Sequence, residues 1–191
     1  MKTLTIPPVS EPITLAEAKN FLRVEENDDD ALINLLIGAA RRRAEFLTGR
    51  VLLTQTWLLN GSTIAAALGC PIVLDVTPVQ AVVSFQYYDS ANALQTLTGF
   101  AYVPSETHAY LKPPAAGWPT LYDRADALQI TVRAGYGDTP AAVPEEIRQW
   151  MLLRIGTAYE QRQALVIGAT SQELPASYVD GLLDPYRIWE L

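Results

Sequence analysis

The sequence has a single cysteine, Cys70, and a single histidine, His108, among its 191 residues. One cysteine excludes an internal disulfide and any zinc site built from cysteines, and one histidine excludes the HExxH pattern and other multi-histidine sites. Apolar runs are also short, because the longest candidate, 63–76, is interrupted by Pro71 and Asp75. We therefore expect a protein without a disulfide, a metal ion or a membrane span.

Charged residues are scarce as well, at 18% of the chain, and acidic groups exceed basic ones to give a formal net charge of -7. An average soluble domain has about 25% charged residues. A chain with few charges, 49% apolar residues and four tryptophans has either a large core or a surface that neighbours cover. The acidic balance argues against sequence-independent coating of DNA, which requires a basic face.

Helical patterns occur towards both ends of the chain. Thr14 and Glu17 have the spacing of a capping box and predict the start of a first helix. The acidic run 28–30 predicts the start of a second helix, and Gly49 its end, since glycine readily adopts the left-handed conformation. A third helix is expected to begin near Pro144.

The second helix has two apolar stripes, whereas an ordinary surface helix needs only one. One stripe contains Leu32, Leu35, Leu36, Ala39 and Phe46, and the other contains Ile33, Ile37, Ala40, Ala44 and Leu47. This helix is therefore either central in a bundle or covered by a partner on its second side. The residues alone leave both arrangements open.

The middle of the chain predicts strands, because short β-branched and aromatic runs alternate with turn signals. The predicted strands cover 51–59, 72–76, 81–88, 100–103, 108–112 and 128–134, with a hairpin turn at 89–92. We predict an α+β fold in which an N-terminal helix pair and C-terminal helices form a small bundle, with an inserted antiparallel β region. The expected divisions are 1–50 for the N-terminal helices, 51–138 for the β-rich region, 139–170 for the third core helix and 171–191 for a short helix, near 176–183, and a docking tail.

Catalytic and cofactor patterns are weak throughout. His108 is the one possible base for a nucleophilic triad and is interpreted as an ordinary sheet histidine. Cys70 is expected to be a small core residue. The acidic run 28–30 lacks the spacing of a calcium loop, and Gly135-x-Gly137 lacks the third glycine of a dinucleotide-binding turn. We predict no enzyme and no cofactor, with a small hydrolase using His108 as a minor alternative.

Two surface features have open interpretations. The basic run Arg41, Arg42 and Arg43 is either a solvated face with local ion pairs or a contact for an acidic partner or a DNA backbone. The terminal residues are of the types that anchor interfaces, and they dock either on the chain's own core or on a partner. These are Tyr186, Arg187, Ile188 and Trp189.

Several short motifs occur in a characteristic order along nearly the whole chain. They include Pro12-Ile13-Thr14-Leu15, Asp29-Asp30-Ala31-Leu32, Thr48-Gly49-Arg50, Thr54-Gln55-Thr56-Trp57, Ala134-Gly135-Tyr136-Gly137 and Leu183-x-Pro185-Tyr186-Arg187. In this order and spacing the sequence resembles the head–tail connector, or head-completion adaptor, proteins of tailed bacteriophages, prophages and gene transfer agents. The segment 62–69 departs from the resemblance, since relatives often have a more polar strand and turn there.

The resemblance implies a ring of copies, typically twelve, under the portal in the neck of a virion or phage-like particle, assembled in the bacterial cytoplasm. The implied partners are the portal protein, a neck, stopper or tail protein, and other copies of the chain. Double-stranded DNA would pass without specific binding, and no membrane, catalysis or cofactor is implied. A stopper or tail terminator is the alternative.

The resemblance also gives the surface features expected roles. Tyr186, Arg187, Ile188 and Trp189 become candidates for docking on the portal or tail. The candidates for a subunit or channel surface are Arg41, Arg42, Arg43, Ile33 and Ile37.

Overall fold

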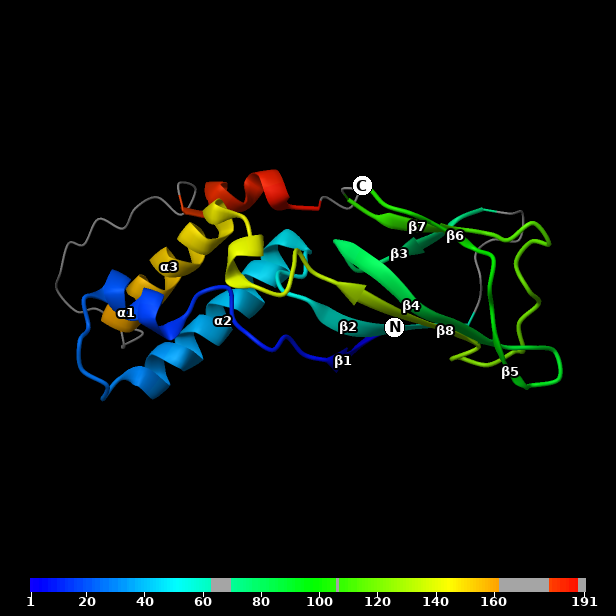
Figure 1. Cartoon of the computed structure of the whole chain (residues 1–191), viewed down its shortest axis with the longest axis horizontal. Coiled ribbons are helices and arrows are strands. Elements are labelled where there is room, and N and C mark those ends of the chain that lie inside the picture. The colour runs from blue at the N-terminus through cyan, green and yellow to red at the C-terminus, as the bar shows by residue number, and fades with distance from the viewer. Residues whose placement is uncertain (63–69, 106, 162–178, 189–191) are drawn as a thin grey trace. The chain divides into compact units, whose positions relative to one another are not determined.

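The computed structural model describes residues 1–62, 70–105, 107–161 and 179–188 (Figure 1). The chain divides into a β unit, formed by Met1–Pro8 and Thr54–Tyr136, and a helical unit, formed by Val9–Leu53 and Gly137–Leu191. The predicted α+β class is confirmed, with helices and antiparallel sheets in one chain.

The larger sheet of the β unit has five antiparallel strands in the order β1-β2-β8-β4-β5. They are β1 (Lys2–Ile6), β2 (Gln55–Gly61), β4 (Val79–Tyr88), β5 (Leu94–Thr96) and β8 (Leu128–Ala134). The central strand β8 has the predicted bounds, whereas the two edge strands β1 and β5 are not among the predicted strands. The expected hairpin joins β4 to β5, where the Asp89 amide donates to the Ala93 carbonyl at 3.0 Å.

A smaller sheet of the same unit has the antiparallel order β3-β7-β6, formed by β3 (Ile72–Leu74), β7 (Ala109–Lys112) and β6 (Ala101–Val103). The hydroxyl of Tyr102 in β6 donates to the Val79 carbonyl in β4 at 2.8 Å and so joins the two sheets. Phe85 of the larger sheet stacks on Trp118 with ring centroids 5.7 Å apart. Phe85 and Leu111, from the two sheets, are almost completely buried and belong to the core of this unit.

The two residues considered for chemistry in this unit have different environments. His108 is half-buried directly before β7, as an ordinary sheet residue would be. Cys70 is exposed, so the prediction that it is a core residue was wrong. The thiol lies just before β3, outside the alternating pattern that buries Leu74.

The helical unit contains α1 (Leu15–Leu22), α2 (Asp30–Thr48), α3 (Glu145–Glu160) and the 3-10 turns η1 (Pro140–Ala142) and η2 (Gly181–Tyr186). The amide of Glu17 donates to Thr14 Oγ1 at 3.2 Å, as the capping motif predicts. The Glu17 carboxylate instead reaches α3, where Arg148 donates to it. Gly49 ends α2 with φ of 69°, as expected. Of the helix predicted near 176–183, residues 179 and 180 are helical and 181–183 belong to η2, while 176–178 lie outside the described residues.

The core of the helical unit lies where α1, α2, α3 and η2 contact one another. Trp150 and Met151 of α3 are fully buried there, together with Ile13 before α1 and Leu183 of η2. Burying an apolar side chain of this size contributes roughly 1.5–3 kcal/mol. The small bundle therefore has a core of its own, as predicted.

Candidate docking surfaces

The two apolar stripes of α2 have different surroundings. Ile33 and Ile37, at 0% and 1% exposed, are packed in the core of the helical unit, with Ala40 and Ala44 of the same stripe. This corrects the choice of these isoleucines as surface candidates, because α1, α3 and η2 cover their side of α2 (Figure 1). The surface of this helix is its other stripe.

That exposed stripe defines what we call the outer face of α2. Leu35 is 64% exposed and Phe46 is 75% exposed, although both are large apolar side chains. Ala39, Arg42 and Arg43 are also exposed. At about 100° per residue these five positions lie within about 100° of the helix surface. The outer face of α2 is thus apolar along its length, with two arginines at its C-terminal half.

The three consecutive arginines have separate roles in the structure. Arg41 is only 12% exposed and donates to Glu11 at 2.7 Å and to Glu45 at 2.9 Å. Arg43 extends over the ring of Phe46, 5.5 Å from its centroid. Among the described residues, no carboxylate forms an ion pair with Arg42 or Arg43. The expected local ion pair with Glu45 is therefore present at Arg41, although this side chain is largely buried, while Arg42 and Arg43 are exposed.

The C-terminal segment is docked on the helical unit as far as Ile188. The hydroxyl of Tyr186 donates to Glu146 at 2.7 Å, and this bond holds the pKa of the Glu146 carboxyl below its ordinary value. Arg50 donates to the Tyr186 carbonyl at 2.6 Å, and the amide of Ile188 donates to the Thr48 carbonyl at 3.0 Å. Both interactions tie the tail to the end of α2.

The other tail candidates complete this picture. Arg187 pairs with Asp184 at 3.2 Å. The side chain of Ile188 lies beside Gly49, where a β-carbon would be only 3.6 Å from it. Trp189 lies outside the described residues. Tyr186 and Ile188 thus bind the chain's own helical unit, whereas Arg187 pairs within the segment, and the docking of the tail on a partner stays a prediction.

An acidic loop joins α1 to α2. Glu25, Glu26 and Asp28 are exposed on it. The neighbouring Asp29 and Asp30 are bound within the unit, since Tyr159 donates to Asp29 and Lys19 donates to Asp30. In the part of the chain that the structure describes, no group of three or more histidine, cysteine or acidic side chains is arranged to hold a metal ion. The exposed carboxylates are therefore available as a negative surface.

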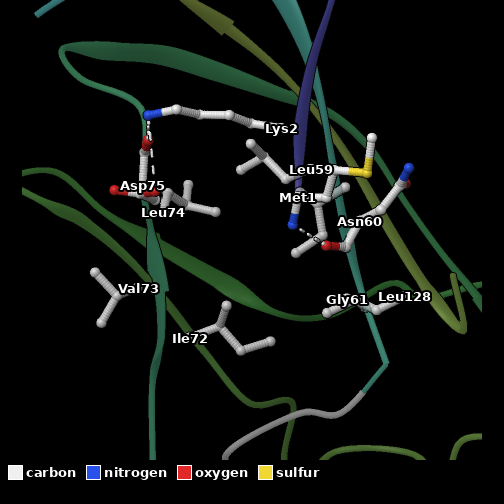
Figure 2. A pocket seen from close by; sticks show the side chains of 11 residues that line it. Met1, Lys2, Leu59, Asn60, Gly61, Ile72, Val73, Leu74, Asp75 and Leu128 are labelled. Atoms are coloured by element: carbon white, nitrogen blue, oxygen red, sulfur yellow. Dashed lines mark hydrogen bonds and ion pairs between the residues drawn. The ribbon is translucent and has the colours of Figure 1, made fainter. Parts of the chain in front are cut away.

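The β unit has a partly open pocket of about 350 Å³ between its strands (Figure 2). Its walls are mainly apolar and include Leu59, Ile72 and Leu128. At its rim the Met1 ammonium donates to the Asn60 carbonyl at 2.8 Å, and Lys2 donates to the Asp75 carbonyl at 3.2 Å. These polar groups hydrogen-bond to one another at the rim. They do not form the pairing of a nucleophile with a general base that catalysis by a side chain requires.

The fold and these surfaces define an α+β protein with two units and several exposed apolar and charged features. Residues 12–91 match the family model of phage gp6-like head–tail connector proteins. This match confirms the resemblance to head–tail connectors that the motifs indicate. No curated protein matches the sequence, and within the described residues no helix has the length and apolarity of a membrane span.

Solved structures with the same fold come from gene transfer agent (GTA) particles. A chain from the neck of an empty GTA particle, computed with C6 symmetry, is 20% identical with a TM-score of 0.82. A chain from the virion of the native GTA particle is also 20% identical with a TM-score of 0.80. A chain from the native neck, computed with C12 symmetry, is 19% identical with a TM-score of 0.78. Each match covers 100% of this chain and 97% of the other chain.

Proposed function

We propose that the protein is a structural head–tail connector in the neck of a phage or gene transfer agent particle, with no catalytic role. The observation that carries this proposal is the agreement of two independent comparisons. Residues 12–91 match the connector family, and the full chain has the fold of chains from GTA necks and virions. Sequence motifs and three-dimensional fold therefore support the same place in a particle.

In this role, copies of the chain form a ring under the portal, extend the DNA channel and offer a platform to the next neck or tail protein. The symmetries named for the two similar necks, C6 and C12, support a ring of twelve copies as the proposal. A closed ring requires two different complementary surfaces on each copy. The exposed features of the helical unit provide more than one candidate surface.

The acidic character of the chain fits a channel protein. When a protein binds DNA phosphates, each lysine or arginine that contacts the DNA backbone releases counterions and adds to the affinity. A net charge of -7 works against such contacts and would let a duplex pass without being held. Duplex DNA is therefore proposed as a passing partner without specific binding.

The C-terminal tail is the proposed contact with the portal. Tyr186 and Ile188 anchor this segment to the helical unit. Tyrosine, arginine and tryptophan are the residue types that most often dominate interface energetics. In this proposal Arg187 and Trp189 contact the portal, while Tyr186 and Ile188 hold the segment in place.

Two experiments test the proposal. Electron microscopy of purified heads, with and without the protein, should show added density at the portal vertex, and its absence would overturn the connector function. Co-sedimentation with portal particles should fail for a chain lacking 186–191 and weaken for Trp189→Ala. Tyr122→Ala, at an exposed tyrosine of the β unit, is the matched control and should bind normally. Unchanged binding of the truncated chain would contradict docking through the tail alone.

A further inference from the structure

We infer that the outer face of α2 docks on the acidic loop of a second copy of this chain, through Glu25, Glu26 and Asp28. The contact joins two different surfaces, so it repeats head to tail from copy to copy. This inference rests on the proposed function for its place in a ring, and it names the surfaces that would form the contact between subunits.

The first argument is the uncovered apolar surface. Leu35 and Phe46 are 64% and 75% exposed on one side of a helix whose other side is fully packed. Such an aligned apolar strip is more typical of an interaction surface than singly scattered apolar residues are. The outer face of α2 therefore has the apolar centre that a protein interface requires.

The second argument is charge. Arg42 and Arg43 flank this apolar strip, and no carboxylate of the described residues forms an ion pair with either. Covering the strip would remove these guanidinium groups from water, which is favourable only when acidic groups of the partner pair with them. The occupant must therefore be apolar in part and acidic in part.

The third argument is that the chain itself has a surface with this composition. Glu25, Glu26 and Asp28 are exposed on the loop between α1 and α2. Phe21, 45% exposed at the end of α1, adds an apolar side chain near these carboxylates in the sequence. The acidic loop thus complements the outer face of α2 in both charge and apolar character.

The same charges decide the type of symmetry. If two outer faces of α2 met each other, Arg42 and Arg43 of both copies would be brought together, and their like charges would oppose the contact. Pairing the outer face with the acidic loop removes that repulsion. A contact between unlike surfaces generates rings or open filaments, whereas a contact between like surfaces generates a closed dimer.

A DNA backbone is the other acidic partner considered for these arginines. Phosphates would satisfy the positive charges of Arg42 and Arg43 but would leave Leu35 and Phe46 without an apolar counterpart. The combination of arginines with a large exposed aromatic residue therefore favours a protein partner. DNA binding becomes one of the outcomes of the test.

The test measures self-association of the full chain by sedimentation velocity up to about 0.5 mM, a concentration at which even weak contacts of millimolar affinity are detectable. Arg42→Glu/Arg43→Glu should weaken the association on the order of tenfold or more, and so should Glu25→Arg/Glu26→Arg. Combining all four substitutions should restore it, because the charges are then exchanged across the contact. Lys112→Glu/Arg133→Glu, at exposed cations of the β unit, is the matched control and should associate like the wild type.

A second measurement locates the contact directly. The photo-reactive substitution Phe46→p-benzoylphenylalanine in unlabelled chains, mixed with isotope-labelled chains, should give cross-links between chains at 21–28. Cross-links elsewhere, absence of rescue in the fourfold variant, or a wild-type protein that stays monomeric at about 0.5 mM would each overturn the inference. Loss of duplex DNA binding in the Arg42→Glu/Arg43→Glu variant, with self-association unchanged, would show that DNA is the partner.

These outcomes are distinct from those of the proposed function. A chain that adds density at the portal vertex but does not associate through the outer face of α2 would overturn this inference and leave the connector function standing. A chain that associates as inferred but adds no density to heads would overturn the connector function alone.

Discussion

Asp180 shows how single residues connect the C-terminal segment to α3. Its Oδ1 atom accepts a hydrogen bond from the Trp150 indole at 3.0 Å and another from Arg154 at 2.7 Å. The bond from Trp150, followed by the effects of Arg154, holds the pKa of the Asp180 carboxyl below its ordinary value, against the opposing effect of burial. The folded-state pKa is thus lower than the unfolded value of about 3.9. The ionised carboxylate stabilises the fold above that unfolded value, and this contribution is lost as the pH falls through the folded pKa.

Asp180→Ala should lower the free energy of unfolding by about 1–3 kcal/mol, because the buried Trp150 N–H would lose its acceptor. Asp180→Asn keeps an oxygen for Trp150 and should cost less. Urea unfolding followed by circular dichroism at pH 7 measures both. The difference between wild type and Asp180→Asn should shrink when the pH is lowered below the folded pKa. Equal losses for the two variants at pH 7 would contradict the role of the indole bond.

Two glycines are expected to respond in opposite ways to alanine. A β-carbon at Gly137 would lie 2.6 Å from that of Ala142, so Gly137→Ala should destabilise the helical unit by about 1–3 kcal/mol. At Gly38, within α2, the nearest atoms would be Arg42 Nη1 at 3.5 Å and Glu11 Oε1 at 3.7 Å, which are ordinary contacts. Gly38→Ala should therefore stabilise the protein by up to about 1 kcal/mol, since alanine favours helix more than glycine does. Thermal unfolding checks both, and a shift of the same sign would refute this account.

Among the elements, α2 gives the clearest contrast between its two sides. Ile37→Ala should cost about 2–5 kcal/mol, because it removes packed atoms from the core. Leu35→Ala, on the outer face of α2, should change the stability by no more than about 0.5 kcal/mol. Chemical denaturation at low protein concentration, where copies do not associate, makes the comparison. A large loss for Leu35→Ala would mean that the outer face is covered within the chain.

The sequence predicts most elements where local signals are strong. The capping motif at Thr14 and the glycine at 49 mark the helix ends that the structure shows. The strand 128–134 is predicted with its observed bounds because its alternating residues are buried on one face of the central strand. Strands β1 and β5 are absent from the prediction. Strand β1 is exposed throughout and precedes two prolines, and strand β5 has only three residues, all of them exposed. Their conformation depends on pairing with β2 and β4, which periodicity does not reveal.

The candidate surfaces were predicted less completely for a similar reason. Two apolar stripes are visible in the sequence of α2, but only packing against α1 and α3 decides that Ile33 and Ile37 form the core stripe. The run of three arginines likewise hides a difference, since Arg41 is bound to Glu11, thirty residues away in the sequence. Distant contacts of this kind require the fold.

For the whole molecule, the net charge of -7 leads to a prediction about DNA. A 20-base-pair duplex should show no change in fluorescence anisotropy with up to about 100 μM protein at about 0.15 M salt, because few cations face outward together. At low salt, weak binding through Arg42 and Arg43 alone would have a salt dependence with a slope of no more than about 2 in magnitude. Arg42→Ala/Arg43→Ala should abolish that residual binding, while Lys112→Ala/Arg133→Ala serves as the control. Micromolar binding at physiological salt would contradict passage of DNA without retention. A steep salt dependence that survives the loss of both arginines would contradict it as well and would show a DNA-binding face elsewhere on the molecule.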